Sequence, residues 1–182
     1  MISNLLSAIL EKINLKVMLI IALLLITALF FFNLLVVLSL IIISLAISFL
    51  VGKSRIIRHI GIELVAFTTI ITGVVYGGGI SILIGLILII FHLAMSGYFG
   101  TYVIWVVPEY TLMGYVASLM TTMSITSVGL AIVIGIGILN MFFTFLVFRE
   151  NVIRYLPWVM TNIIFNAVLF FFLAPPLVQV LQ

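Results

Sequence analysis

The sequence IELVAFTTIITGVVYGGGISILIGLILIIFHLAMSG, residues 62–97, decides the fold, because it consists of two apolar arms joined by a glycine-rich turn at residues 76–79. Each arm carries one ionisable residue: Glu63 lies 14 residues before Gly77, and His92 lies 14 residues after Gly78. At 1.5 Å per helical residue, both lie about 21 Å from the turn. The stretch therefore predicts an antiparallel helical hairpin with a carboxylate and an imidazole at equal depth.

An ionisable side chain inside a membrane span is costly unless it is paired. This cost favours a direct or water-mediated contact between Glu63 and His92. The alternative is that each side chain extends separately to the headgroups, because both lie near the ends of their arms.

Small residues recur along one side of each arm at steps of three and four. Helices in lipid use small residues to approach each other closely, and residues 73–77 form a small-xxx-small pattern. We therefore expect helix packing at Gly73, Gly77, Gly78, Gly85 and Gly114.

The composition places the chain in a membrane. Of 182 residues, 66% are hydrophobic and only 6% are charged, which is too little charge to cover a soluble domain of this size. The absence of cysteine excludes disulfides and thiolate metal sites, and a net charge of +3 spread over short loops does not indicate nucleic-acid binding. The lipid bilayer is the expected environment.

Long uncharged runs predict an all-α polytopic membrane protein, a compact bundle of six or seven transmembrane helices in a single domain over residues 1–182. As one helix, the run Val17–Val51 would be about 52 Å long, which exceeds the roughly 30 Å hydrocarbon core of a bilayer. We therefore predict a turn near Asn33. Residues 1–16 form an amphipathic lead-in, and Pro175-Pro176 end the last helix. The predicted spans are 17–32, 34–51, 60–76, 79–97, 105–122, 128–148 and 157–174.

The positive charges predict the orientation. Seven spans with a cytoplasmic N-terminus place every Lys and Arg on the cytoplasmic side, as the positive-inside rule favours. Six spans with a shallow hairpin remain the alternative. The expected location is the cytoplasmic cell membrane, multi-pass, and the residues concerned are Lys12, Lys16, Lys53, Arg55, Arg58, Arg149 and Arg154.

No enzyme is predicted. The chain has no Asp, which argues against metal-dependent phosphotransfer, and it contains no HExxH, P-loop or G-x-S-x-G motif. We therefore expect no catalytic residues, no metal and no cofactor. Intramembrane polar residues instead predict a hydrogen-bonded network that holds helices together or a docking surface for a membrane partner. These residues are Glu63, His92, Glu109, Asn140 and Asn162. Glu63, His92 and Glu109 could also form a proton relay.

Residues 61–120 resemble the central part of the substrate-binding S-components of energy-coupling-factor vitamin transporters. The resemblance rests on Tyr76-Gly77, Gly85, His92, Gly97-Tyr98-Phe99-Gly100 and a Gly-small helix starting at Gly114. The closing TNIIFNAVLFFFLAPPL, residues 161–177, is also similar to the ends of these proteins and of the rod shape-determining membrane protein MreD.

The resemblance implies an S-component-like bundle and a subunit that captures a small, vitamin-type molecule and works with other membrane subunits. Its candidate substrate-binding residues are Tyr76, Thr121, Thr122 and Asn166. Two further hypotheses remain: an MreD-like scaffold without catalytic activity, and a small proton-coupled carrier that uses Glu63 and His92.

Overall fold

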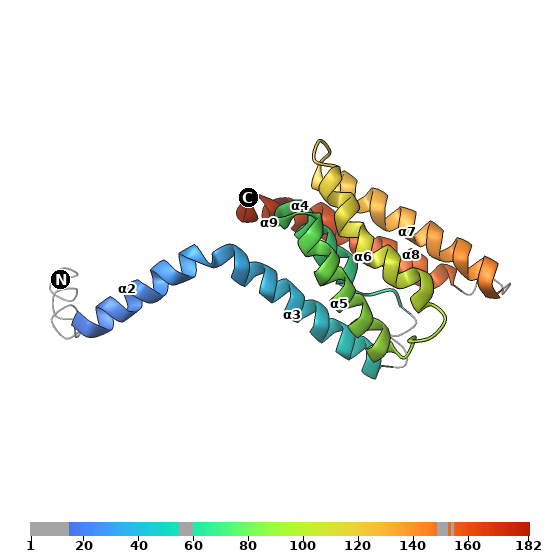
Figure 1. Ribbon diagram of the computed structural model, residues 1–182, viewed down its shortest axis with the longest axis horizontal. Coiled ribbons are helices and arrows are strands. Elements are labelled where there is room, and N and C mark those ends of the chain that lie inside the picture. Colours follow the sequence, from blue (N-terminus) through green and yellow to red (C-terminus); the bar gives the residue numbers. More distant parts are fainter. Residues whose placement is uncertain (1–14, 55–59, 149–152, 154) are drawn as a thin grey trace, which may run out of the picture. The chain divides into compact units, whose positions relative to one another are not determined.

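The computed structural model describes residues 15–54, 60–148, 153 and 155–182, and within these ranges the chain is all-helical (Figure 1). It forms two compact units, Met1–Val36 and Val37–Gln182. In chain order the helices are α2 (Leu15–Phe30), α3 (Phe32–Lys53), α4 (Val65–Tyr76), α5 (Gly78–Ser96), α6 (Val103–Leu119), α7 (Ile125–Phe148), α8 (Leu156–Val168), the π-helical turn η3 (Leu169–Leu173) and α9 (Ala174–Leu181).

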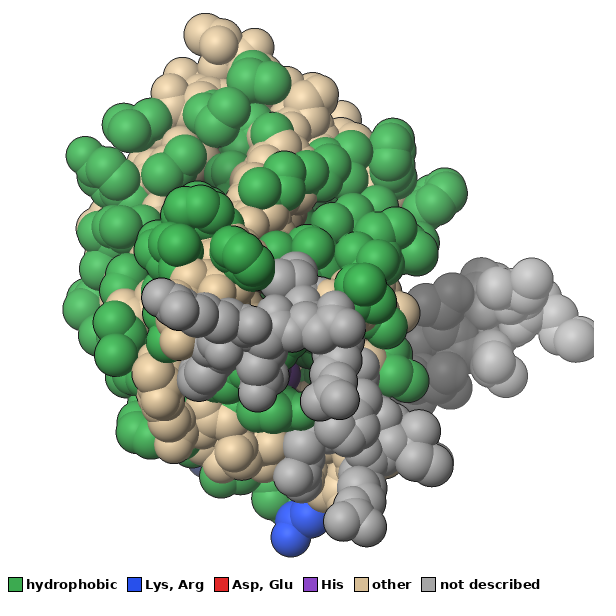
Figure 2. Space-filling view, turned by 90° about the vertical axis from the view of Figure 1, so that its right-hand side faces the viewer, with side chains coloured by type: hydrophobic (Ala, Val, Ile, Leu, Met, Phe, Trp, Pro, Cys, Tyr) green, Lys and Arg blue, Asp and Glu red, His purple; other side chains and the backbone are tan. Residues whose placement is uncertain are grey.

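Length and hydropathy make the chain a multi-pass membrane protein. Four helical stretches in the described residues are long and apolar enough to cross a bilayer, namely Phe32–Lys53, Gly78–Ser96, Ile125–Val147 and Leu156–Leu181. Large aliphatic and aromatic side chains such as Ile104, Ile138 and Phe172 point outward, and Figure 2 shows hydrophobic side chains spread over one face of the molecule. Lipid is the solvent that such a surface requires.

The N-terminal unit contains α2 and the first turn of α3. The boundary between these helices lies at Phe31, two residues before the predicted turn near Asn33. The Phe31 N–H donates to the Thr27 carbonyl at 3.0 Å, and the Leu35 N–H donates to the Phe31 carbonyl at 2.9 Å. Helical hydrogen bonding therefore continues on both sides of the boundary.

Several sequence predictions concern residues outside the described ranges. They are residues 1–14 of the amphipathic lead-in, which include Lys12, and four basic residues of the predicted cytoplasmic loops, Arg55, Arg58, Arg149 and Arg154.

Helix α4 is the core of the second unit. It packs against α5 and α6, and every residue from Val65 to Gly73 is buried. Its backbone contacts α6 directly, because a Cβ added at Gly73 would lie 2.0 Å from the Gly114 carbonyl oxygen, and one added at Gly114 would lie 2.5 Å from the Thr69 carbonyl oxygen. Only glycine at both positions allows this approach.

The link between α4 and α5 is a single residue. Gly77 has φ +86°, a conformation that glycine adopts without steric cost, and α5 begins at Gly78. Along α5, a Cβ added at Gly85 would meet the Thr69 side chain at 2.8 Å and the Tyr110 carbonyl oxygen at 2.9 Å. The turn thus brings α5 onto α4, and Gly85 lets it pack against α4 and α6.

The last helical stretch does not end at Pro175-Pro176. It passes through η3, where the Ala174 N–H donates to the Leu169 carbonyl five residues earlier. In this register the Phe170 carbonyl would receive the N–H of Pro175, which proline lacks. The Thr126 hydroxyl supplies the missing donor at 2.9 Å, so the helix continues as α9 to Leu181.

Candidate functional site

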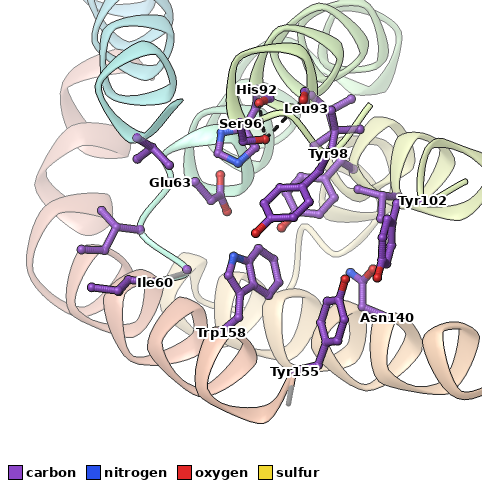
Figure 3. A pocket seen from close by; sticks show the side chains of 16 residues that line it. Ile60, Glu63, His92, Leu93, Ser96, Tyr98, Tyr102, Asn140, Tyr155 and Trp158 are labelled. Atoms are coloured by element: carbon purple, nitrogen blue, oxygen red, sulfur yellow. Dashed lines mark hydrogen bonds between the residues drawn. The ribbon is translucent and has the colours of Figure 1, made fainter. Parts of the chain in front are cut away.

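A pocket of about 240 Å³ lies beyond the N-terminal end of α4, where the loop after α5 and the starts of α6 and α8 meet (Figure 3). Its described lining is aromatic and aliphatic, with a few polar groups. The lining residues are Val51, Ile60, Gly61, Ile62, Glu63, Ile89, His92, Leu93, Ser96, Tyr98, Tyr102, Val106, Tyr110, Asn140, Tyr155 and Trp158.

Glu63 is held at the pocket by neutral hydrogen-bond donors. The carboxylate Oε2 accepts the Ala66 N–H at 3.0 Å, and Oε1 accepts the Asn162 side-chain amide at 3.1 Å. The N–H groups in the first turn of a helix have no partner within that helix, and the Glu63 carboxylate supplies one for the Ala66 N–H. Glu63 is 1% exposed, and it is one of the residues that line the pocket.

Helix α8 positions the segment that carries Glu63. The Gly61 N–H donates to the Thr161 hydroxyl at 2.9 Å, and the Gly61 carbonyl accepts the Asn162 amide at 3.0 Å. A Cβ at Gly61 would lie 2.4 Å from the Trp158 carbonyl oxygen, so glycine is required for this approach. The backbone of Gly61 and the carboxylate of Glu63 are therefore positioned by the same amide.

His92 reaches the same pocket from α5. Its Nδ1 lies 3.0 Å from the Ser48 hydroxyl of α3, and its backbone carbonyl accepts the Ser96 hydroxyl at 2.7 Å. Figure 3 shows Glu63 and His92 directed into the same space. In the described part of the chain, no hydrogen bond or ion pair joins them. The two residues share a cavity, but each has a different partner.

An aromatic wall completes the pocket. The ring centroids of Tyr98 and Tyr102 are 6.5 Å apart, and those of Tyr102 and Tyr155 are 5.7 Å apart. Trp105 packs behind Tyr102 at 5.2 Å and donates its indole N–H to the Asn140 side-chain oxygen at 3.2 Å. Tilted and edge-on contacts of this kind hold each ring in place.

Glu109 and Asn140, two further members of the predicted polar network, form no hydrogen bond with Glu63. Both carboxylate oxygens of Glu109 are buried without a hydrogen-bond partner, and Glu109 is not among the lining residues. Asn140 lines the pocket, but its bond is to Trp105 and not to Glu63.

The four predicted substrate-binding residues do not meet in one pocket. Tyr76 ends α4, at the opposite end from Glu63, and its hydroxyl is buried without a partner. Thr121 lines a second hollow of about 300 Å³ beside α9, and Thr122 is exposed. Asn166 is fully buried on α8, where its amide donates to the Asn162 carbonyl at 3.1 Å.

Sequence analysis missed the aromatic wall and the serine partner of His92. Aromatic residues are common at membrane interfaces, so their presence in the sequence did not indicate a shared pocket. The four that line the pocket are Tyr98, Tyr102, Tyr155 and Trp158. The available signal was position, because Tyr98 lies six residues after His92 and Trp158 lies four residues before Asn162.

The lining of the pocket has the composition of a small-molecule site. Apolar and aromatic walls with a few convergent polar groups are the usual construction of a ligand site. Among the described residues no group of three or more His, Cys, Asp or Glu side chains is arranged to hold a metal ion. In comparisons with known proteins, no family model, no curated protein and no solved structure matches the chain.

Proposed function

We propose that this membrane protein binds a small organic molecule in the aromatic pocket at the N-terminal end of α4, and that it acts as the ligand-binding subunit of an uptake system completed by other membrane proteins. The observation that carries the proposal is the convergence of Glu63, His92 and Asn140 on one cavity with aromatic walls. A scaffold that only holds other proteins does not need such a cavity.

The construction of the pocket supports this function. Glu63 is held by bonds from two different elements, and the aromatic rings are held by one another. Groups positioned before the ligand arrives lose little conformational entropy on binding. The polar atoms are thus preorganised for recognition.

The test is recovery of the ligand. The full chain is purified from native membranes in mild detergent, and bound small molecules and proteins are identified by mass spectrometry. We expect a small molecule that is lost in Val106→Trp, because Val106 lines the pocket and the larger side chain would fill it. The matched control is Val116→Trp, since Val116 lies on the same helix and is 43% exposed.

A small molecule that is absent from the Val106 variant and retained by the Val116 variant supports the proposal. Membrane proteins recovered without any small molecule would contradict it and favour the scaffold hypothesis.

A second candidate is a proton-coupled carrier, which the shared cavity of Glu63 and His92 favours. The purified chain alone, reconstituted in liposomes containing a pH-sensitive dye, would then move protons when the recovered ligand is added. Loss of this signal in Glu63→Gln would support the carrier. An unchanged internal pH in the wild type would exclude it.

A further inference from the structure

We propose that the ligand is a compact organic cation, with its charged group seated between the Glu63 carboxylate and the rings of Tyr98 and Trp158. The inference rests on the proposed function and specifies the chemical class of the ligand.

The first argument is charge. Glu63 is the acidic residue of the described lining, and no Lys or Arg is found among the described residues there. Its described hydrogen-bond partners, which include the Ala66 N–H, the Asn162 amide and the Tyr110 hydroxyl, are all neutral. A carboxylate withdrawn from water is costly without a compensating positive charge. A cationic ligand supplies that charge in the place where Figure 3 shows the carboxylate directed.

The second argument is the aromatic wall. Figure 3 shows Tyr98 and Trp158 next to each other, beside the space in front of Glu63. Aromatic faces attract cations through their negative quadrupole, and several such rings around one space are the usual way in which proteins bind quaternary ammonium groups. Tyr102 and Tyr155 extend the same wall.

The third argument is size. A volume of about 240 Å³ corresponds to roughly eight water molecules at about 30 Å³ each. A trimethylammonium group with a short tail fits in this space. The charged end is expected at Glu63, and the apolar side of the pocket near Ile89 and Val106 receives the remainder.

The test compares two molecules of the same shape. Choline and 3,3-dimethylbutan-1-ol differ in one central atom, which is a charged nitrogen in the first and a neutral carbon in the second. Binding of each to the full chain in nanodiscs is measured by saturation-transfer difference NMR. We expect choline to bind at least tenfold more tightly than the alcohol.

Four variants assign the preference to this pocket. Glu63→Gln should reduce it to less than threefold, whereas Glu109→Gln, which changes a carboxylate outside the lining, should leave it intact. Tyr98→Leu should reduce the preference and Tyr98→Phe should retain it, because phenylalanine keeps the ring. The Tyr98 pair gives an independent result if Glu63→Gln fails to fold.

The outcomes separate the two proposals. Equal binding of choline and the alcohol, or recovery of a neutral or anionic ligand from native membranes, overturns the cation while the binding function stands. If neither probe binds and no small molecule is recovered, both proposals fail. A recovered ligand that carries a positive charge supports the inference.

Discussion

Gly73→Ala tests the packing on which the core of the bundle depends. The new methyl carbon would lie 2.0 Å from the Gly114 carbonyl oxygen, 2.6 Å from the Gly114 carbonyl carbon and 2.8 Å from its Cα. All three are backbone atoms, so no side-chain rotation relieves the clash. Helices α4 and α6 would have to separate by about 1.4 Å to restore ordinary contact, and overpacking of this kind costs about 3 kcal/mol.

The intrinsic preference of a helix for alanine over glycine, about 1 kcal/mol, offsets part of this cost. We therefore expect Gly73→Ala to lower the free energy of unfolding by about 2 kcal/mol. Gly135→Ala is the matched control on α7, because a Cβ there meets no atom within 4 Å. It should raise the stability by about 0.5–1 kcal/mol, since the same methyl group is added without a clash.

The assay is reversible unfolding of each variant by SDS in mixed micelles, followed by the fluorescence of Trp105 and Trp158. The two variants should differ by about 3 kcal/mol, although the chemical change is identical. Equal stabilities would refute the reasoning, because they would mean that α4 and α6 do not approach each other at Gly73.

Three further substitutions test the site and its supports. Asn162→Leu removes the donor shared by the Gly61 carbonyl and the Glu63 carboxylate. At about 1–3 kcal/mol for each of these two buried acceptors, it should cost about 2–6 kcal/mol in the same unfolding assay. A loss below about 1 kcal/mol would contradict the assigned bonds. Thr126→Val removes the donor to the Phe170 carbonyl, so it should lower the free energy of unfolding by about 1 kcal/mol and speed hydrogen exchange around η3. The control Thr122→Val, at an exposed threonine, should change neither quantity. Ser48→Ala removes the partner of His92 Nδ1, so the imidazole ¹⁵N resonances of His92 should shift, and unchanged resonances would show that the bond is absent.

Hydropathy and glycine spacing predicted the class of the fold well. The all-α character and the long apolar helices follow from uncharged runs, which have no other stable structure in lipid. The turn at Gly77 was predictable for a local reason, because the chain reverses there through a positive φ that glycine permits.

The partners of the polar residues were not predictable, because they are set by packing between helices far apart in the sequence. Asn162 lies 99 residues after Glu63, and Ser48 lies 44 residues before His92. Sequence spacing along the hairpin placed Glu63 and His92 at one depth, but it contained no information about α3 and α8. The predicted direct or water-mediated contact between Glu63 and His92 stays a prediction, and the structure adds a separate partner for each residue.

The cavity itself follows from the unequal lengths of the two hairpin arms. Helix α4 has 12 residues and α5 has 19, so their lengths are about 18 Å and about 28 Å, and both are measured from the turn at Gly77. Helix α5 consequently extends about 10 Å beyond the start of α4, and this overhang carries His92 and Ser96. The non-helical backbone from Ile60 to Leu64 runs beside it, where Gly61 is bonded to α8. Equal arms would have placed about two turns of helix where the pocket lies. The late start of helicity at Val65, which follows the bonds from α8 to Gly61, is therefore what leaves room for a ligand.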